Sequence, residues 1–541
     1  MGYRRYPPPQ PLLIGYDPVR DLPLDHLARL IEQVVEETVI PPRRSPRRGQ
    51  PPYDPRLCVK VLIYSYCTGV RSSRVMARHC KESLPYLFLT RGDAPSHDTL
   101  CTARLEQGEF LEAVWEGLFS VAAAVGLPRL GRVTLDSTKL RANASPEAVL
   151  PQAEYAAVRA ELERIQAEVA RVDAQEAATD SAGRTELGRV VPQEHMRDIL
   201  RRVRRQRSQA GRPSQAPPQP PDAGPGSDPP GPGTLPGLDG QSGPATPTPE
   251  PAPSLAPEPM SAQMLRRITA ALAAIQEAQA EQRKQLCLTD PDARMMYGER
   301  HRGTRESHSF EVATDNGLLV AARSSQAAND NDCLGPLVDA AREHEPAGIT
   351  AVDADCGYYT GAGVAALLRE GVDTCIPDSH TTADLHQGQP IGTTRARSRG
   401  KVPLTYDPAA DAYHCPEGNT LVRTQHRWDQ AQYVTVYRAQ EPCGECPQRA
   451  DCLTQENAQH RTLKVADDHA LLEAARQRFN EPAHQARYHH RGEQVETVFG
   501  FLRGTLGFTR WLLRGAKKVE CEAKLFKTAY QLRKVHRAWA G

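Results

Sequence analysis

The stretch GRVTLDSTKLRANAS, residues 131–145, carries the segment that decides the fold. Within it, RVTLDSTKL at 132–140 is predicted to be a strand, but helical patterns precede and follow it, so no partner strand lies nearby in the sequence. We therefore expect this strand to pair with strands formed after residue 296. That pairing would make residues 146–295 an insertion in the domain that contains the sheet.

The region after residue 296 alternates between predicted strands and helices. SFEVATDNGLLVAAR, residues 309–323, has the pattern of a β-hairpin with Asn316-Gly317 at its turn. The stretches that follow predict in turn a helix, a strand, a helix and a strand: LGPLVDAAREH, GITAVDAD, GAGVAALLREG and VDTCIP. This alternation indicates an α/β fold.

The insertion is expected to be a helical hairpin. Apolar residues repeat at spacings of three and four from Tyr155 to Val172 and again from Leu265 to Ile275. Between these seams, residues 213–259 are so rich in Pro and Gly that we expect a disordered tip. An intermolecular coiled coil is the alternative. The run RRVRRQR at 201–207 either contacts DNA or forms a solvated face.

The N-terminal region has short helical patterns separated by turns. LDHLARLIEQVVEETV and DPRLCVKVLIYSYCTG show 3.6-residue apolar periodicity, with Arg43, Arg44, Arg47 and Arg48 between them. This arrangement suits a helix-turn-helix-like DNA-binding unit, although any small helical bundle would give a similar pattern.

Composition narrows the class of protein. The 541 residues carry a net charge of only +1, but residues 484–541 hold twelve Lys and Arg against four Asp and Glu. That segment is either a phosphate-binding surface or a solvated basic helix. Because no apolar run approaches the length of a membrane span and the N-terminus lacks a signal-peptide core, we expect a cytoplasmic protein without membrane contact.

Acidic residues stand where an α/β sheet builds its sites. Asp136 and the pair Asp353 and Asp355 follow predicted strands, at the edge where such sheets bind ligands. The predicted helical stretch VETVFGFLRGTLGFTRWLLRGAKKVE, residues 495–520, has Glu496 near its start among Arg and Lys residues. Three converging carboxylates would hold two Mg²⁺ ions, which can activate water and stabilise the leaving oxygen of a phosphodiester.

Three blocks in this order, DSTKLRANAS, TAVDADCGYY and YHHRGEQVETVFGFLRGTLGFTRWLLRG, resemble the signature blocks of bacterial insertion-sequence DDE transposases, in the subgroup with a Tyr-Arg-Glu-Lys signature. The stretch YDPRLCVKVLIYSYCTGVRSSRVMARHC resembles the helical N-terminal leader domain of that group. The resemblance implies an RNase H-like mixed-sheet catalytic domain that uses Mg²⁺ or Mn²⁺.

The resemblance assigns roles to individual residues. Asp136, Asp355 and Glu496 match the three metal-binding catalytic acids, with Asp353 and Glu493 as the rivals of the second and third. Tyr488 and Arg491 match the signature Tyr and Arg, and Arg503 stands where the family usually has Lys. The predicted DNA-binding residues are Tyr488, Arg491, Arg503, Arg510, Arg514, Lys517 and Lys518.

The implied function is DNA transposition by cleavage and strand transfer. The implied partners are double-stranded DNA, at the terminal inverted repeats of the element and at the target, and a second copy in a synaptic homodimer, so the protein would associate with the nucleoid. Two alternatives stay open: a catalytically decayed or repurposed DNA-binding protein, and a metal-dependent DNA nuclease on the same scaffold.

Four cysteines form a separate candidate metal site. Cys443 and Cys446 make a C-x₂-C pair, Cys452 follows, and Cys415 precedes them by a gap of 27 residues. Four thiolates can close a structural zinc site, and four reduced thiols are the alternative.

The predicted organisation thus has six parts: a helical N-terminal DNA-binding domain, 1–125; the first catalytic strand, 126–145; the helical insertion, 146–295; the catalytic core, 296–400; a small Cys-rich insertion, 401–465; and the catalytic helix with the basic C-terminal segment, 466–541.

Overall fold

The computed structural model describes residues 17–41, 53–181, 196–210, 262–298, 303–391, 402, 404–407, 409–429, 432–453 and 457–540. The predicted Pro-rich tip at 213–259 and the arginines at 43–48 lie outside these residues. The chain divides into two compact units, Met1–Ala144 with Asp292–Gly541 and Ser145–Pro291.

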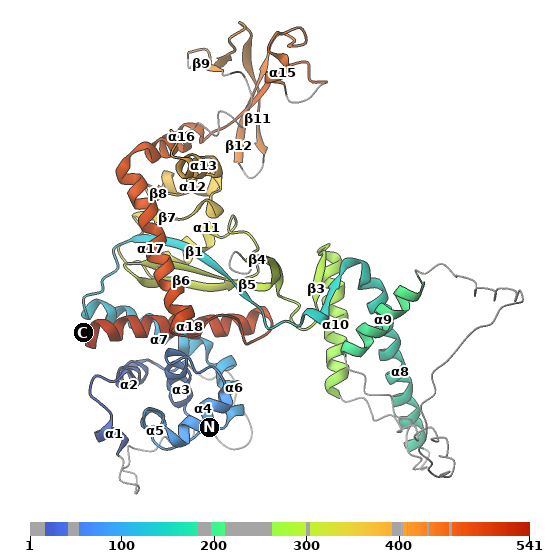
Figure 1. Cartoon of the computed structure of the whole chain (residues 1–541), viewed down its shortest axis with the longest axis vertical. Helices are drawn as coiled ribbons and strands as arrows, with labels where there is room; N and C mark the ends of the chain where they lie inside the picture. Colours follow the sequence, from blue (N-terminus) through green and yellow to red (C-terminus); the bar gives the residue numbers. More distant parts are fainter. Residues whose placement is uncertain are drawn as a thin grey trace, which may run out of the picture. The chain divides into compact units, whose positions relative to one another are not determined.

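The first unit contains a mixed sheet with β1 (Arg132–Arg141) near its centre (Figure 1). The other strands are β4 (Arg294–Gly298), β5 (Gly303–Asp315), β6 (Leu318–Ser325), β7 (Ala351–Asp353) and β8 (Asp373–Cys375). β1 pairs antiparallel with β5 and parallel with β7, and β7 pairs parallel with β8. The prediction that this early strand joins the later sheet is confirmed.

The β5–β6 hairpin turns at Asn316-Gly317, as predicted from the sequence. Both residues have positive φ, at 50° and 75°, which is the backbone that a tight hairpin turn requires and that Asn and Gly adopt most readily. One face of the sheet packs on α11 (Leu334–Arg342) and α12 (Gly361–Arg369) through buried residues such as Leu135, Leu337 and Val364.

The N-terminal residues form a cluster of helices: α1 (Pro18–Asp21), α2 (Leu27–Glu37), α3 (Pro55–Cys67), α4 (Ser73–Glu82), α5 (Leu84–Thr90), α6 (His97–Glu106) and α7 (Gly108–Ala124). Their core is continuous with α17 (Pro482–Gly504) and α18 (Ala516–Ala540). α18 packs against α3 and α7 and also against β6 (Figure 1). The rings of Tyr66 and Phe526 meet edge to face at 5.0 Å. The leader helices and the C-terminal helix therefore fold around one apolar core.

A further antiparallel sheet follows the β8 region: β9 (Thr405–Asp407), β10 (Ala412–His414), β11 (Thr420–Asp429), β12 (Gln432–Ala439) and β13 (Thr462–Ala466). The short helix α15 (Arg449–Cys452) lies between its last two strands in the sequence. α13 (Ser379–Gln387) precedes this sheet in the chain, and α16 (His469–Gln477) follows it.

The second unit is a helical bundle closed by a two-stranded ribbon. α8 (Tyr155–Ser181) packs against both α9 (Met196–Ala210) and α10 (Ala262–Ala280), while β2 (Val149–Pro151) pairs antiparallel with β3 (Gln285–Cys287). The predicted seams are largely buried from Tyr155 to Val169 and at Ile268 and Ile275; the Val172 side chain lies outside the described part. The α8–α10 pair agrees with the predicted hairpin, whereas α9 is a third helix that the periodicity did not indicate.

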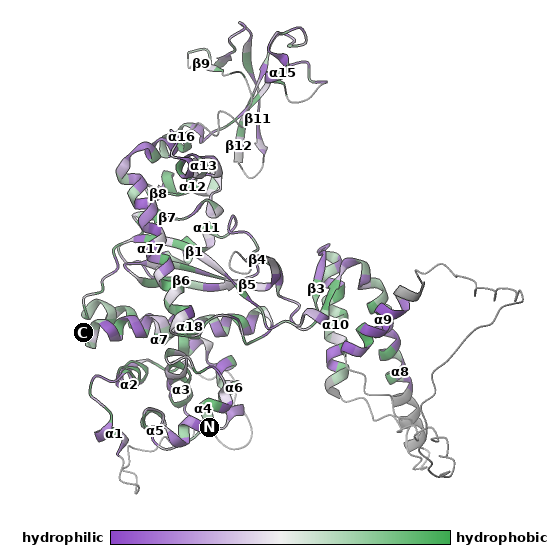
Figure 2. Ribbon diagram, in the orientation of Figure 1, coloured by the Kyte–Doolittle hydropathy of each residue, from purple (hydrophilic) through white to green (hydrophobic). Residues whose placement is uncertain are grey.

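The basic run at 201–207 lies on α9, which is mainly hydrophilic in Figure 2. Ile199, Leu200 and Val203 bury one side of this helix. Arg202 and Arg204 form ion pairs with Glu161 and Glu154. Part of the charge on α9 thus holds the bundle together.

Candidate active site

Two aspartates meet at one level of the sheet. Asp136 lies in the middle of β1, because the strand runs on to Arg141 instead of ending near the aspartate as the sequence suggested. The parallel register pairs Thr134 with Asp353, the last residue of β7. Two residues further along each chain come Asp136 and Asp355. The register of two central strands therefore brings this predicted pair together.

The electrostatics of the pair show how close the carboxylates are. Burial and, next, the negative charge of Asp355 raise the pKa of Asp136 to about 7, against the hydrogen bond that its carboxylate accepts from the Ser137 amide. Burial also raises the pKa of Asp355, with Arg491 and the Gly357 amide acting in the opposite direction. Two half-buried acids that repel one another, with only oxygen donors, suit a hard divalent cation such as Mg²⁺ or Mn²⁺.

Asp353, the rival for the second position, is engaged elsewhere. Arg487 forms ion pairs with both Asp353 and Asp373. The Asp355 carboxylate instead accepts a hydrogen bond of 2.9 Å from the Gly357 amide within its own turn. Of Asp353 and Asp355, it is thus Asp355 whose charge acts on Asp136.

Glu496 is exposed on α17, because the positions that bury this helix are Val495, Val498 and Leu502. Its rival Glu493 is also exposed and lies 2.9 Å from the His490 ring. Among the residues that the structure describes, no three His, Cys, Asp or Glu side chains are grouped so that they could hold a metal ion. The structure brings together the first two predicted acids but does not place the third beside them.

α17 lies along the same face of β1 as Asp136. Thr134 donates to Gln494 at 2.7 Å, and Arg503 donates to Thr138. Because alternate residues of a strand face the same side, Asp136 lies between these two contacts. The Arg503 guanidinium is therefore held at Thr138, two residues beyond Asp136 on β1.

Two other predicted DNA-binding residues also belong to this helix. The Arg491 guanidinium lies 5.2 Å from the centre of the Tyr488 ring, and that ring meets Phe479 edge to face. The positive charge of Arg491 also opposes the raised pKa values of Asp136 and Asp355. Arg491 is accordingly the cation of α17 whose field reaches both acids.

The predicted helix over 495–520 is interrupted. α17 ends at Gly504 and α18 begins at Ala516, so the residues between them form a loop. The buried carboxylate of Glu522 holds this loop by accepting hydrogen bonds from the amides of Leu512 and Leu513 and from Arg71. Phe508 and Trp511 are buried, so their rings pack in the core.

The remaining predicted DNA contacts lie on this loop and at the start of α18. Arg510, Lys517 and Lys518 are exposed, and Arg514 is exposed while donating to the carbonyl of Asn143 at 2.7 Å. The loop therefore presents cations next to the end of β1.

The sequence did not single out Asp330, which lies between β6 and α11. Its carboxylate accepts from Ser137 at 2.9 Å and from Lys139 at 2.6 Å, so it is tied to the strand that carries Asp136. Its charge contributes to the raised pKa values of both Asp136 and Asp355. Its context, AANDND after a strand, resembles an ordinary polar turn.

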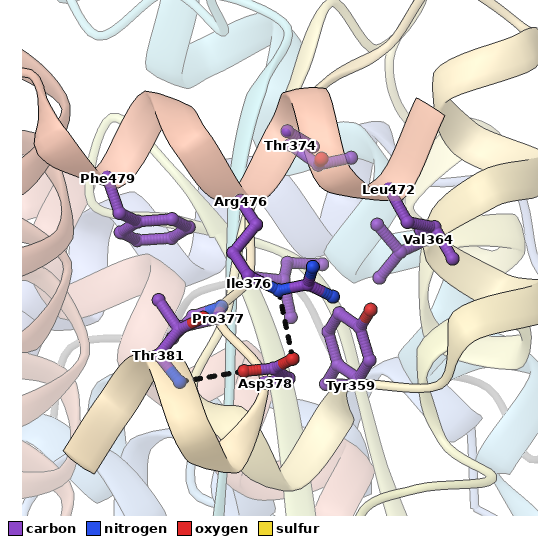
Figure 3. Close-up of a pocket in the computed structure, with 11 residues that line it drawn as sticks. Tyr359, Val364, Thr374, Ile376, Pro377, Asp378, Thr381, Leu472, Arg476 and Phe479 are labelled. Carbon is purple, nitrogen blue, oxygen red and sulfur yellow. Dashed lines mark hydrogen bonds and ion pairs between the residues drawn. The ribbon is translucent and has the colours of Figure 1, made fainter. Parts of the chain in front are cut away.

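A cleft of about 510 Å³ lies along α17 beside Thr134 and Asp353, two residues before each acid of the pair. Thr134 and Asp353 line it from the sheet, Gln494 and Arg487 from α17. Arg132, Arg478 and His490 add potential cations to its wall. A smaller cavity between α12, α13 and α16 is structural: its volume is about 10 Å³, and the buried Arg476–Asp378 ion pair crosses it (Figure 3).

The four predicted zinc ligands lie in segments that connect the strands of the sheet that begins with β9. Cys415 accepts a hydrogen bond from the Asn419 amide at 3.3 Å, and the Asn419 side-chain amide lies 3.9 Å from the Cys443 sulfur. Burial raises the pKa of Cys452, with Arg461 opposing and Cys443, Cys446 and Cys415 adding to the rise. The thiols are therefore neighbours, although they do not form a metal-holding group as they stand.

Two family models match the chain. Residues 17–106 match one described as Transposase domain (DUF772), and residues 414–536 match one described as Transposase DDE domain. A comparison with curated proteins found no match. No described helix is long and apolar enough to span a membrane.

Both matches are to transposase domains, so the helical N-terminal region and the α17–α18 region belong to the transposase class. Since the second is the DDE domain, the two matches together indicate an insertion-sequence DDE transposase. The resemblance found in the sequence is confirmed at this level, whereas the Tyr-Arg-Glu-Lys subgroup stays a prediction. Glu496 falls within the matched residues; Asp136 and Asp355 fall outside them.

Proposed function

We propose that this transposase binds the ends of its DNA element and catalyses metal-dependent strand cleavage and strand transfer. The observation that supports the proposal is the half-buried pair of Asp136 and Asp355, which follow paired positions of the parallel strands β1 and β7 and whose charges interact. Catalysis of phosphodiester exchange by such sites depends on carboxylates that hold divalent cations.

The finer fold assignment that we propose is an RNase H-like catalytic domain. It is supported by the strand order β6-β5-β1-β7-β8, in which β1, β7 and β8 are parallel and β5 runs against β1. Asp136 lies on the central strand and Asp355 directly after its parallel neighbour, and α17 crosses the same face.

Asp136 and Asp355 would hold Mg²⁺ or Mn²⁺, with Glu496 as the proposed third ligand, whose exposed side chain can take up other rotamers. The cation would supply a Lewis acid that activates the attacking hydroxyl and stabilises the leaving oxygen. Arg491 and Arg503 of α17 act close to Asp136 of β1. Their guanidinium groups would orient the phosphates of the cleaved strand.

The exposed cations Arg510, Lys517 and Lys518 would bind the DNA backbone beyond the site, which is the usual role of such residues in positioning a duplex. We also propose, on the family resemblance, a homodimer that holds two element ends together. Because these cations would bind phosphates, the affinity for end-containing DNA should fall as the salt concentration rises.

A strand-transfer assay tests this proposal against its alternatives. The purified protein is incubated with labelled DNA that carries the ends of its own element, with target plasmid, and with Mg²⁺ or Mn²⁺. Joined products are the expected result. Cleavage without joining would instead support a nuclease, and binding without cleavage a decayed DNA-binding protein.

We propose in addition that Cys415, Cys443, Cys446 and Cys452 hold a structural zinc ion. The amide contacts from Asn419 to Cys415 and Cys443 support this, because N–H groups commonly surround metal-bound thiolates. Protein purified without chelator should contain about one zinc ion per chain by mass spectrometry, and Cys443→Ser should lose it. Cys101→Ser, an exposed cysteine elsewhere, is the control. Zinc-free wild-type protein would contradict the proposal.

A further inference from the structure

The two oxygen atoms of the Asp330 carboxylate have different surroundings. Its Oδ1 atom accepts hydrogen bonds from the Lys139 ammonium and the Ser137 hydroxyl. Lys139 also donates to the hydroxyls of Ser137 at 3.0 Å and Ser309 at 3.2 Å, so the ammonium has a fixed place on β1. Both partners of the ion pair are largely buried, with side chains 16% and 18% exposed, so solvent screens their charges weakly.

The Oδ2 atom of Asp330 faces the catalytic pair. A methyl group placed on Gly357 would lie 3.5 Å from this atom and 3.0 Å from Oδ1 of Asp355. The two carboxylates therefore border the same small space, which stays open because residue 357 has no side chain. Asp136 and Asp355 also repel one another.

Tyr358 points independently to a ligand in this region. Its side chain is fully buried, and its hydroxyl has no hydrogen-bond partner among the described residues. The charged groups that act on this hydroxyl are, in order, Asp330, Asp136, Glu311 and Asp355. A buried hydroxyl next to acids calls for a partner, and a hydrated cation between the acids provides one.

We infer that Asp330 and Lys139 act as an opposed pair of charges that sets the affinity of the Asp136–Asp355 site for its divalent cation. The inference rests on the proposed function, because it takes these two aspartates as cation ligands. Asp330 attracts a cation placed there, and Lys139 repels it. Lys139 lies close enough to act on the site, since its ammonium is 2.6 Å from the Asp330 carboxylate, and the other oxygen of that carboxylate borders the same space at Gly357 as Asp355. Both act as positioning residues, through the field and through β1.

The two charges predict shifts of opposite sign. Asp330→Asn leaves the ammonium uncompensated and should weaken Mn²⁺ binding about tenfold, or about 1.4 kcal/mol. Lys139→Gln leaves the carboxylate uncompensated and should strengthen it by a similar factor. The double variant should return to within about threefold of the wild type, because the net charge is restored.

Calorimetric titration of the full-length protein with Mn²⁺, without DNA, measures these shifts separately from catalysis. Asp332→Asn is the matched control, since it removes the same charge from an exposed side chain two residues away. Thermal unfolding without metal shows whether each variant is folded. If Asp330→Asn does not fold, the direction of the Lys139→Gln shift decides.

Failure of the inference can be told apart from failure of the proposed function. Mn²⁺ binding that Asp136→Asn abolishes, but that Asp330→Asn changes no more than Asp332→Asn does, would overturn the inference alone. Weakening by both Asp330→Asn and Lys139→Gln would also overturn it, since a purely structural role of the ion pair predicts that result. A wild-type protein that binds no Mn²⁺ would overturn both.

Discussion

Asp136→Asn and Asp355→Asn should each lower DNA cleavage by at least about a thousandfold, a loss of about 4 kcal/mol of transition-state stabilisation. Each change replaces a charged ligand by a neutral amide of nearly the same shape, so the proposed cation loses one of its two carboxylates from the sheet. Binding of end-containing DNA should change less than about threefold, because the phosphates contact the basic residues and not the acids.

Cleavage on labelled DNA and a gel-shift titration measure the two effects. Asp353→Asn is the matched control, because this acid lies two residues away and pairs with Arg487. Asp353→Asn should lower the stability of the protein, because it removes this ion pair, and should leave most of the cleavage activity. If Asp353→Asn abolished cleavage and Asp355→Asn did not, the second ligand would be Asp353.

Glu496→Gln extends the same test to the acid that the structure leaves exposed. If Glu496 is the third ligand, cleavage should fall as far as in the aspartate variants, with no change in the unfolding temperature, because the side chain makes no buried contact. Glu493→Gln is the control on the same helix. Cleavage close to the wild-type rate in Glu496→Gln would show that the third ligand is another residue.

The sequence could predict the parts of the fold that local rules determine. The turn at Asn316-Gly317 follows from backbone preference, and the placement of β1 in the later sheet follows from the absence of a local partner. The two aspartates could be predicted because they follow strand patterns and match family blocks. Their closeness depends on a register between residues more than two hundred positions apart, which only the folded sheet provides.

Other features could not be predicted because they depend on tertiary contacts. Asp330 stands in a polar run typical of a turn, and only the folded chain shows that it meets Lys139. The loop after α17 has the apolar spacing of a helix, but Glu522 binds its amides and Trp511 donates to the carbonyl of His308. These bonds replace the helical ones that the periodicity had suggested.

The N-terminal helices show the same limit at the scale of a domain. Their periodicity predicted helices correctly, but α3 is buried on nearly all sides, because α18 covers the surface that a free bundle would expose. Arg71 from the leader forms a buried ion pair with Glu522, which also holds the loop that carries the basic residues. The leader thus supports the proposed DNA-binding loop through the core.

The stability of the metal-free protein should reveal the cost of keeping two acids together. The pKa of Asp136 is about 7 in the folded chain, whereas an aspartate in an unfolded chain titrates near 4. Between these values the folded state binds more protons than the unfolded state. The free energy of unfolding should therefore fall as pH rises from about 4 to about 7, and this contribution should be lost above that range. Three pKa units correspond to at most about 4 kcal/mol.

Asp136→Asn should remove this dependence, because the amide stays neutral at every pH. In EDTA the variant should match the wild type near pH 4 and exceed its free energy of unfolding by about 2 to 4 kcal/mol at pH 8. Denaturant unfolding at several pH values measures the difference in free energy of unfolding between the two proteins. Other titrating groups, such as Glu345, contribute equally to both and cancel in this difference. Mn²⁺ should stabilise the wild type and leave the variant unchanged, since only a ligand that binds the folded state raises its stability. Parallel pH curves for the two proteins would show that neither burial nor the charge of Asp355 raises the pKa of Asp136 in the folded chain. The electrostatic argument that places the Asp355 carboxylate beside Asp136, and a cation between them, would then fail.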